Sequence, residues 1–231
     1  MPRVPEPIFC YVTDRRAFAA SSVPPGSALA DAATLRVESL GDSIRRAVAA
    51  GIGWIQIREK DLDARALVDL ARFAVTEAHQ QDALVMVNDR LDVALAADAS
   101  GIHLGENSLP LELISEWRRS SERADFRIGV SRHSLESARS AEKGGADYVF
   151  FGPVFATPSK AAFGAAQGIE RLREVCAAVS IPVLAIGGVN PANARACLDA
   201  GAAGIAAIRL FQNAQNSADL AAQLKTIKYH Q

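Results

Sequence analysis

Short hydrophobic runs alternate along this chain with longer segments in which apolar residues recur every three or four positions. The short runs are mainly apolar and end in polar or glycine-containing turns, a pattern typical of strands buried on both faces. There are eight of these runs: Ile8–Val12, Trp54–Ile57, Leu84–Val87, Gly101–Leu104, Phe126–Val130, Tyr148–Phe151, Val183–Ile186 and Gly204–Ile208. Ala- and Leu-rich segments with helical spacing lie between them, such as Ala64–Ala78, Ser134–Gly144, Ile169–Val179 and Pro191–Ala200.

Eight alternating strand and helix units predict a single α/β domain, a (β/α)8 TIM barrel over residues 1–231. Five or six units would favour an open, doubly wound sheet instead. Two connections are long: 14–38 is expected to be an insertion after the first strand, and 152–168 follows the sixth. In a barrel both lie at the face where strands end, so each is a candidate lid, with a solvated insertion as the alternative for the first. A C-terminal helix is expected over 214–231.

Helix ends can be read at a few positions. Asn190 followed by Pro191 suits an N-cap with proline at the first helical position, and Gly144 and Gly201 suit C-terminal caps.

Composition narrows the function classes. The chain has 25 Lys and Arg against 26 Asp and Glu, so it presents no broad basic surface for nucleic acid or for a membrane. Its three cysteines are far apart and form no C-x-x-C motif, which fits a reducing cytoplasm better than a disulfide framework or a zinc site. The N-terminus has no leader pattern and no apolar run is long enough to span a membrane. Ala-rich helix faces are compatible with a homodimer.

In such a barrel, function is expected at the residues that directly follow the strands. Gln56, Arg58 and Lys60 alternate after the second strand, so they share one face and form either an anion clamp or a solvated strand edge. Asn88 and Asp89 end the third strand, where they would cap a helix or, for Asp89, offer carboxylate oxygen to magnesium.

Two histidines lie at the ends of neighbouring strands. His103 is interpreted as a packed, hydrogen-bonded residue, whereas His133, just past a strand end and close to Ser131, is a candidate acid or base.

Two further segments suggest a phosphorylated ligand. The loop from Gly152 to Lys160 places Thr157, Ser159 and Lys160 close together, which suits a pyrophosphate or carboxylate, although a surface loop would look the same. Gly187 and Gly188 close the seventh strand and Ile208 with Arg209 ends the eighth, where barrels often bind phosphate.

Several motifs, in this order, resemble the thiamine phosphate synthase/TenI family over about residues 8–213. They are Ile55–Leu62 (IQIREKDL), Val87–Arg90 (VNDR), Gly101–Gly105 (GIHLG), Ala146–Tyr148 (ADY) with Gly152-Pro153, and Ala185–Gly188 (AIGG).

The resemblance implies a synthase that joins hydroxymethylpyrimidine pyrophosphate to hydroxyethylthiazole phosphate and releases pyrophosphate. It implies that Asp89 binds magnesium and that Gly188 and the loop at Ile208 receive the thiazole phosphate. The residues implied to hold the pyrimidine and pyrophosphate are Gln56, Arg58, Lys60, Asn88, Thr157, Ser159 and Lys160.

Three positions depart from the synthase pattern. Gly105-Glu106-Asn107-Ser108 replaces Gly-Gln-x-Asp, so Ser108 stands where the second magnesium carboxylate is expected, with Glu106 nearby as a substitute. Ser159 replaces a Thr, and Arg209 replaces a Ser.

The departures keep two alternatives open. One is a TenI-type thiazole tautomerase, which acts on thiazole carboxylate phosphate without metal and for which His133 would be the central residue. The other is a non-catalytic sensor of a phosphorylated ligand.

Overall fold

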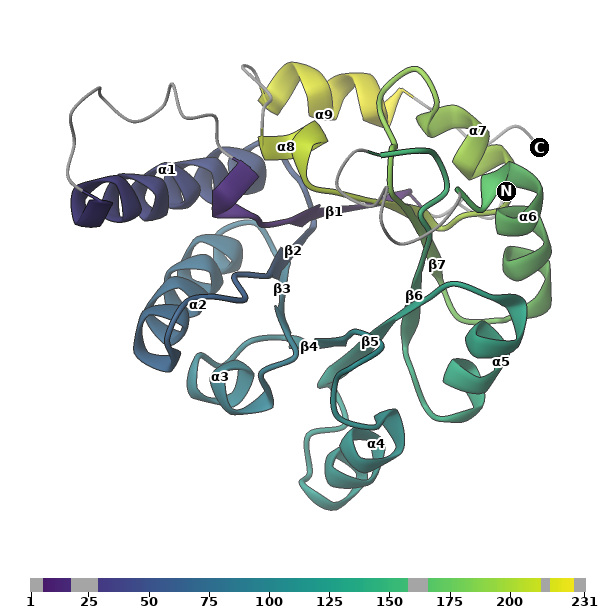
Figure 1. Ribbon diagram of the computed structural model, residues 1–231, viewed down its shortest axis with the longest axis horizontal. Coiled ribbons are helices and arrows are strands. Elements are labelled where there is room, and N and C mark those ends of the chain that lie inside the picture. The colour runs from purple at the N-terminus through teal and green to yellow at the C-terminus, as the bar shows by residue number, and fades with distance from the viewer. Residues whose placement is uncertain (1–5, 18–28, 158–165, 213–216, 227–231) are drawn as a thin grey trace.

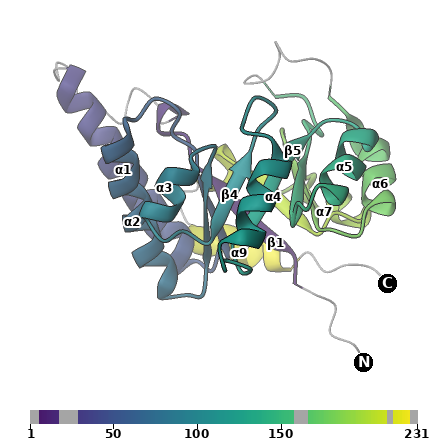
Figure 2. The same cartoon turned by 90° about the horizontal axis from the view of Figure 1, so that it is seen from below.

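The computed structural model describes residues 6–17, 29–157, 166–212 and 217–226, with the backbone alone for 29–38 and 225. Eight parallel strands form one closed barrel in chain order, and helices surround it (Figures 1 and 2). The predicted (β/α)8 fold is therefore confirmed.

The strands agree closely with the hydrophobic runs. They are β1 Ile8–Val12, β2 Trp54–Ile57, β3 Leu84–Asn88, β4 Gly101–Leu104, β5 Arg127–Arg132, β6 Tyr148–Phe151, β7 Val183–Ile186 and β8 Gly204–Ala207. The register closes between β1 and β8, where Ile8 pairs with Gly204. Three strands differ slightly from the prediction: β3 extends one residue further, to Asn88, β5 runs from Arg127 to Arg132 instead of from Phe126 to Val130, and β8 ends before Ile208.

The helices that follow the strands are η1 Arg15–Ala17, α1 Leu29–Ala49, α2 Ala64–His79, α3 Leu91–Ala96, α4 Leu111–Ser120, α5 Leu135–Lys143, α6 Gly168–Ala178, α7 Ala194–Asp199, α8 Arg209–Gln212 and α9 Ser217–Lys225. The structure differs from the prediction of a connection over 14–38, since α1 begins at Leu29 inside it. Ala, Leu and Arg, all good helix formers, are frequent in its sequence LADAATLRVESLGDSIRRAVA.

The helix-end predictions are partly right. The Asn190 side chain accepts hydrogen bonds from the backbone of Ala192 and Asn193, but this contact forms a turn and α7 starts only at Ala194. Gly144 is the C-cap of α5, and Gly201 follows α7 with φ of 95°.

Side chains of the strands alternate between two buried layers. Phe9 and Tyr11 belong to the layer between strands and helices, whereas Cys10 and Val12 fill the barrel interior with Met86 and others. By the same alternation Gln56 and His103 face inward near the carboxyl ends of β2 and β4, since their neighbours Ile55, Ile57, Ile102 and Leu104 pack outward. Apolar side chains thus fill the barrel interior, and polar side chains lie at the end of the barrel where the strands have their carboxyl ends. No helix in the described part of the chain is long and apolar enough to cross a membrane.

Candidate active site at the barrel mouth

A chain of hydrogen bonds links the ends of β2, β3 and β4. The buried Gln56 amide donates to Asn88 Oδ1 at 3.0 Å, and Asn88 Nδ2 donates to Asp89 Oδ2 at 2.7 Å. The second oxygen of Asp89 accepts from the Ser108 hydroxyl and from the Gly105 backbone amide. One continuous chain of hydrogen bonds therefore connects four predicted site residues: Gln56, Asn88, Asp89 and Ser108.

The backbone at Asp89 is held in an uncommon conformation. Its φ is 63°, in the left-handed region that Asp tolerates better than most residues, and its amide donates to the His103 carbonyl at 3.0 Å. The residue before α3 is Arg90, which makes no side-chain cap. Since Asp89 and Asn88 bond to each other and to their neighbours in the mouth, the N-cap interpretation of this pair is wrong.

The carboxylate of Asp89 can serve as one ligand of a hard cation. Three hydrogen bonds reach its two oxygens, two of them at Oδ1, so Oδ2 retains a free lone pair. Magnesium commonly takes only one or two carboxylates and completes its shell with waters and substrate phosphates. Within the described residues no group of three or more His, Cys, Asp or Glu side chains converges on a metal site. The donor set therefore fits an ion held mainly by its phosphate ligand.

Two cations follow β2. The Arg58 side chain is half-buried and its backbone amide donates to Thr13 Oγ1 at 2.9 Å, while Lys60 is exposed. Neither Arg58 nor Lys60 has a side-chain hydrogen bond or ion pair with another described residue. As far as the described residues are concerned, both charges are available to an anion.

Sequence reasoning missed the acidic residues between and beside these cations. Glu59 is buried and Asp61 is partly exposed, and both bind arginines of η1, which follows β1. The alternation Arg58-Glu59-Lys60-Asp61 and the pair Arg15-Arg16 were the available signals.

His103 lies beneath the mouth as a packed residue. It is 1% exposed, its Nδ1 is 3.2 Å from Tyr148 Oη and its Nε2 is 2.9 Å from Ser131 Oγ. Burial lowers the pKa of His103 to about 3, and the positive charges of Arg132 and Arg58 act in the same direction. The imidazole is thus neutral at pH 7 and orients Ser131.

His133 lies on the other side of the mouth. Its Nδ1 is hydrogen-bonded to the Gly152 carbonyl, which can only accept, so Nδ1 carries a proton. Its Nε2 is 3.6 Å from Glu106 Oε1. Glu106 therefore faces His133, and of the two candidates for the missing carboxylate only Ser108 is hydrogen-bonded to Asp89 among the described contacts.

The loops after β6 and β7 pack on each other through glycines. Gly187 and Gly188 have φ of 92° and 67°, and a Cβ on Gly187 would lie 2.6 Å from Pro153 Cα. A Cβ on Gly188 would lie 2.7 Å from the Ala156 carbonyl oxygen. Loop packing alone therefore requires both glycines, whatever ligand they meet.

The other predicted ligand residues are only partly described. Ile208 is half-buried and Arg209 is the exposed first residue of α8. Thr157 lies at the end of the described loop, and Ser159 and Lys160 lie outside the described residues.

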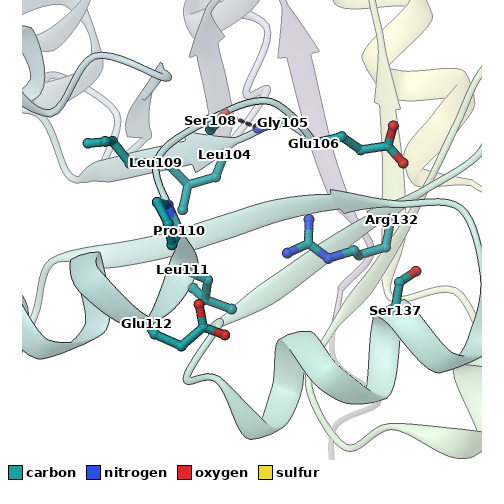
Figure 3. A pocket seen from close by; sticks show the side chains of 10 residues that line it. All are labelled: Leu104, Gly105, Glu106, Ser108, Leu109, Pro110, Leu111, Glu112, Arg132 and Ser137. Atoms are coloured by element: carbon teal, nitrogen blue, oxygen red, sulfur yellow. Dashed lines mark hydrogen bonds between the residues drawn. The ribbon is translucent and has the colours of Figure 1, made fainter.

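A pocket of about 460 Å³ lies beside the mouth (Figure 3). It is lined by Leu104, Gly105, Glu106, Ser108, Leu109, Pro110, Leu111, Glu112, Arg132 and Ser137. Gly105 and Ser108 connect it to Asp89, but Gln56, Arg58 and Lys60 are not among its lining residues. Arg58 and Lys60 therefore lie outside this pocket.

A parallel barrel with an amide, a carboxylate and two cations at the carboxyl ends of its strands, the cations without ion pairs among the described residues, is an arrangement typical of a TIM-barrel enzyme site for an anionic ligand. The family described as thiamine monophosphate synthase matches residues 29–211. The chain belongs to this family, as its motifs predicted.

Individual relatives agree with the family match. The chain is 39% identical over 197 residues to a thiamine-phosphate synthase of Syntrophomonas wolfei, covering 85% of this chain and 92% of the relative. It is 44% identical over 183 residues to that of Methanocella arvoryzae, covering 79% and 84%. A solved thiamine phosphate pyrophosphorylase from Pyrococcus furiosus superimposes with a TM-score of 0.76 at 34% identity, covering 95% of this chain and 94% of the other.

Proposed function

We propose that this protein is a thiamine-phosphate synthase, a transferase that joins hydroxymethylpyrimidine pyrophosphate to hydroxyethylthiazole phosphate. The C–O bond to pyrophosphate breaks, the thiazole nitrogen attacks the resulting pyrimidine cation, and pyrophosphate leaves. The observation that carries this proposal is the hydrogen-bonded series Gln56, Asn88, Asp89, followed in sequence after β2 by Arg58 and Lys60, which form no ion pair within the described part of the chain. Family membership supports the same reaction.

Each group has a role set by its chemistry. Arg58 and Lys60 stabilise the negative charge that grows on the departing pyrophosphate, together with Lys160. Gln56 and Asn88, fixed by their mutual hydrogen bond, present amide groups to the aminopyrimidine. Ser131 Oγ is oriented by His103, and Thr157 and Ser159 offer hydroxyls to the pyrophosphate.

The second substrate is proposed to bind at the opposite rim. Backbone N–H groups at Gly187, Gly188 and Ile208 would bind the thiazole phosphate, and the Arg209 guanidinium adds positive charge there. Loops after β7 and β8 are a common phosphate site in this fold.

Magnesium is proposed as the cofactor of this reaction. Asp89 would hold it through the free lone pair on Oδ2, and the bound ion would neutralise charge on the pyrophosphate leaving group. Ser108 donates a hydrogen bond to Asp89 in place of a second carboxylate, and Glu106 is engaged with His133.

The test is product formation from both phosphorylated precursors with magnesium. We expect thiamine phosphate to form, and Asp89→Ala to reduce the rate by about 100-fold or more. Asp199→Ala, which removes an exposed carboxylate on α7, is the matched control and should retain the rate. An active preparation in which Asp89→Ala makes product as fast as the parent would contradict the assignment.

One observation supports a second candidate, a metal-independent thiazole tautomerase. The His133 Nδ1–H bond to Gly152 leaves Nε2 unprotonated in the neutral ring and facing Glu106, an arrangement suited to proton transfer. If this activity exists, His133→Ala should abolish turnover of the thiazole carboxylate phosphate, and chelators should leave that turnover unchanged in the parent protein. Absence of turnover in both assays would leave the non-catalytic sensor as the remaining hypothesis.

A further inference from the structure

The segment after β2 carries four consecutive charges of alternating sign. In the order Arg58, Glu59, Lys60, Asp61, the two cations lack ion-pair partners among the described residues, and the two anions each have at least one. A carboxylate next to a cation in sequence is an obvious competitor for it, because both lie within a few ångströms. The structure must therefore keep Glu59 and Asp61 away from Arg58 and Lys60.

Glu59 is kept away by burial and by Arg15. Its side chain is 2% exposed, and both carboxylate oxygens accept from the Arg15 backbone amide at 3.1 Å. Arg15 Nη1 also donates to Oε2 at 3.1 Å. Burial raises the pKa of Glu59, and hydrogen bonds from Thr13 and Arg15 oppose that rise. A buried carboxylate needs such partners to remain charged.

Asp61 is held by the same arginine and by the next one. Arg15 binds it with two hydrogen bonds of 2.6 and 2.7 Å, and Arg16 adds contacts of 2.9 and 2.6 Å to Oδ2. Although burial pushes the pKa of Asp61 upward, the hydrogen bonds from Arg15 and Arg16 hold it below its ordinary value. Forked, charge-assisted pairs of this kind are strong and geometrically selective.

The Arg15 guanidinium, 11% exposed, therefore spans both carboxylates and ties η1 to the β2–α2 loop. We propose that Arg15, assisted by Arg16, is a positioning residue that occupies Glu59 and Asp61, so that Arg58 and Lys60 stay free for a pyrophosphate group. This inference rests on the proposed function, since it assigns a role in binding the same substrate. Arg15 acts through its neighbours and does not itself touch the ligand.

The decisive experiment compares Arg15→Gln with the double variant Arg15→Gln/Glu59→Gln. Inorganic pyrophosphate is titrated into each full-length protein by calorimetry, and the KM for each substrate is measured. In Arg15→Gln, the released carboxylates should pair with Arg58 and Lys60, so pyrophosphate affinity should fall about 10-fold. In the double variant one competing charge is gone, so affinity should return to within about 3-fold of the parent.

A comparison of the two substrates distinguishes a positioning role of Arg15 from a general loss of structure in the variant. The KM for the pyrimidine pyrophosphate should rise with the fall in affinity, while the KM for the thiazole phosphate stays constant. Arg195→Gln, which breaks an ion pair with Asp199 on α7, is the matched control and should change neither value. Unchanged affinity in Arg15→Gln, an equal rise in both KM values, or a double variant no better than the single one would overturn the proposal.

A second pair of variants, at more exposed positions, tests the proposal if Arg15→Gln fails to fold. Arg16 is 68% exposed, so Arg16→Gln should remain folded and lower pyrophosphate affinity about 3-fold. Adding Asp61→Asn to it should restore the affinity, and failure to do so overturns the proposal. If the parent protein itself neither binds pyrophosphate nor forms product, the proposed function fails and this role falls with it. A parent that does both, with variants indistinguishable from it, refutes the positioning role alone.

Discussion

Protonation of His103 should couple the stability of the barrel to pH. In the unfolded chain a histidine has a pKa near 6.5, whereas burial lowers the pKa of His103 to about 3 in the folded protein. Below pH 6.5 the unfolded state therefore binds a proton that the folded state does not. The contribution of His103 to the free energy of unfolding is therefore fully present above pH 6.5 and is lost as the pH falls towards 3.

The expected size follows from these two values. Each pH unit inside the window costs about 1.4 kcal/mol, so the free energy of unfolding should fall by about 2 kcal/mol between pH 7 and pH 5. The ordinary pKa of most carboxylates lies below pH 5. We therefore expect His103 to be the main source of the change in the free energy of unfolding between pH 7 and pH 5. The whole window corresponds to about 5 kcal/mol.

Urea unfolding at pH 7, 6 and 5 measures the effect. His103→Gln retains a donor and an acceptor for Ser131 and Tyr148 but loses the ring contact with Phe150, so it should be less stable at pH 7 by about 2 kcal/mol. Its loss of stability from pH 7 to pH 5 should be smaller than the parent's by about 2 kcal/mol. His79→Gln, which removes an exposed histidine, should keep the parent's pH dependence.

Equal pH dependence in His103→Gln and the parent would refute this reasoning. Should the variant fail to fold, the imidazole proton signals of the parent give the same answer, since those of His103 should not titrate between pH 5 and pH 8. A midpoint in that range would contradict the assignment of a neutral, buried ring.

Two other substitutions test packing and metal binding. Gly129→Ala would place a Cβ 1.9 Å from Tyr148 Cζ, so urea unfolding should show a loss of about 3 kcal/mol, whereas Gly53→Ala, with nothing within 4 Å, should change stability by less than about 1 kcal/mol. Equal losses in the two variants would show that the ring moves aside freely. Ser108→Asp would put a second carboxylate next to Asp89, and calorimetry with magnesium alone should show about 10-fold tighter binding. Unchanged or weaker magnesium binding would mean that the two carboxylates do not converge.

The barrel could be predicted because most strand residues are buried on both faces of the sheet, so the strands appear in the sequence as mainly apolar runs. Val183–Ile186, for example, reads Val-Leu-Ala-Ile and is bounded by Pro182 and Gly187. The start of α1 was missed for the opposite reason. Its first turns follow a segment with Pro24 and Pro25, and the polar and small residues around Leu29 obscure the helical spacing.

The part of the site that lies at the ends of the strands could be predicted from the sequence. Gln56, Asn88 and Asp89 could be placed at one edge because parallel strands end together. The pairing of Arg15 with Glu59 could not, since the two are 44 positions apart and no periodic pattern relates them. Likewise, Ser108 could be seen as a missing carboxylate but not as a hydrogen-bond donor to Asp89.

That donor role changes how the departure at Ser108 should be understood. Two adjacent carboxylates repel each other until a cation arrives, so a site built from them depends on the metal for its geometry. A hydroxyl beside Asp89 instead fixes the carboxylate by a hydrogen bond, and the Gly105 amide adds a second one to the same oxygen. The mouth then has one negative charge fewer opposing Arg58 and Lys60. A pyrophosphate is attracted by net positive charge. Compared with a second carboxylate, Ser108 therefore weakens the binding of a metal ion and strengthens the direct attraction of the site for the anion.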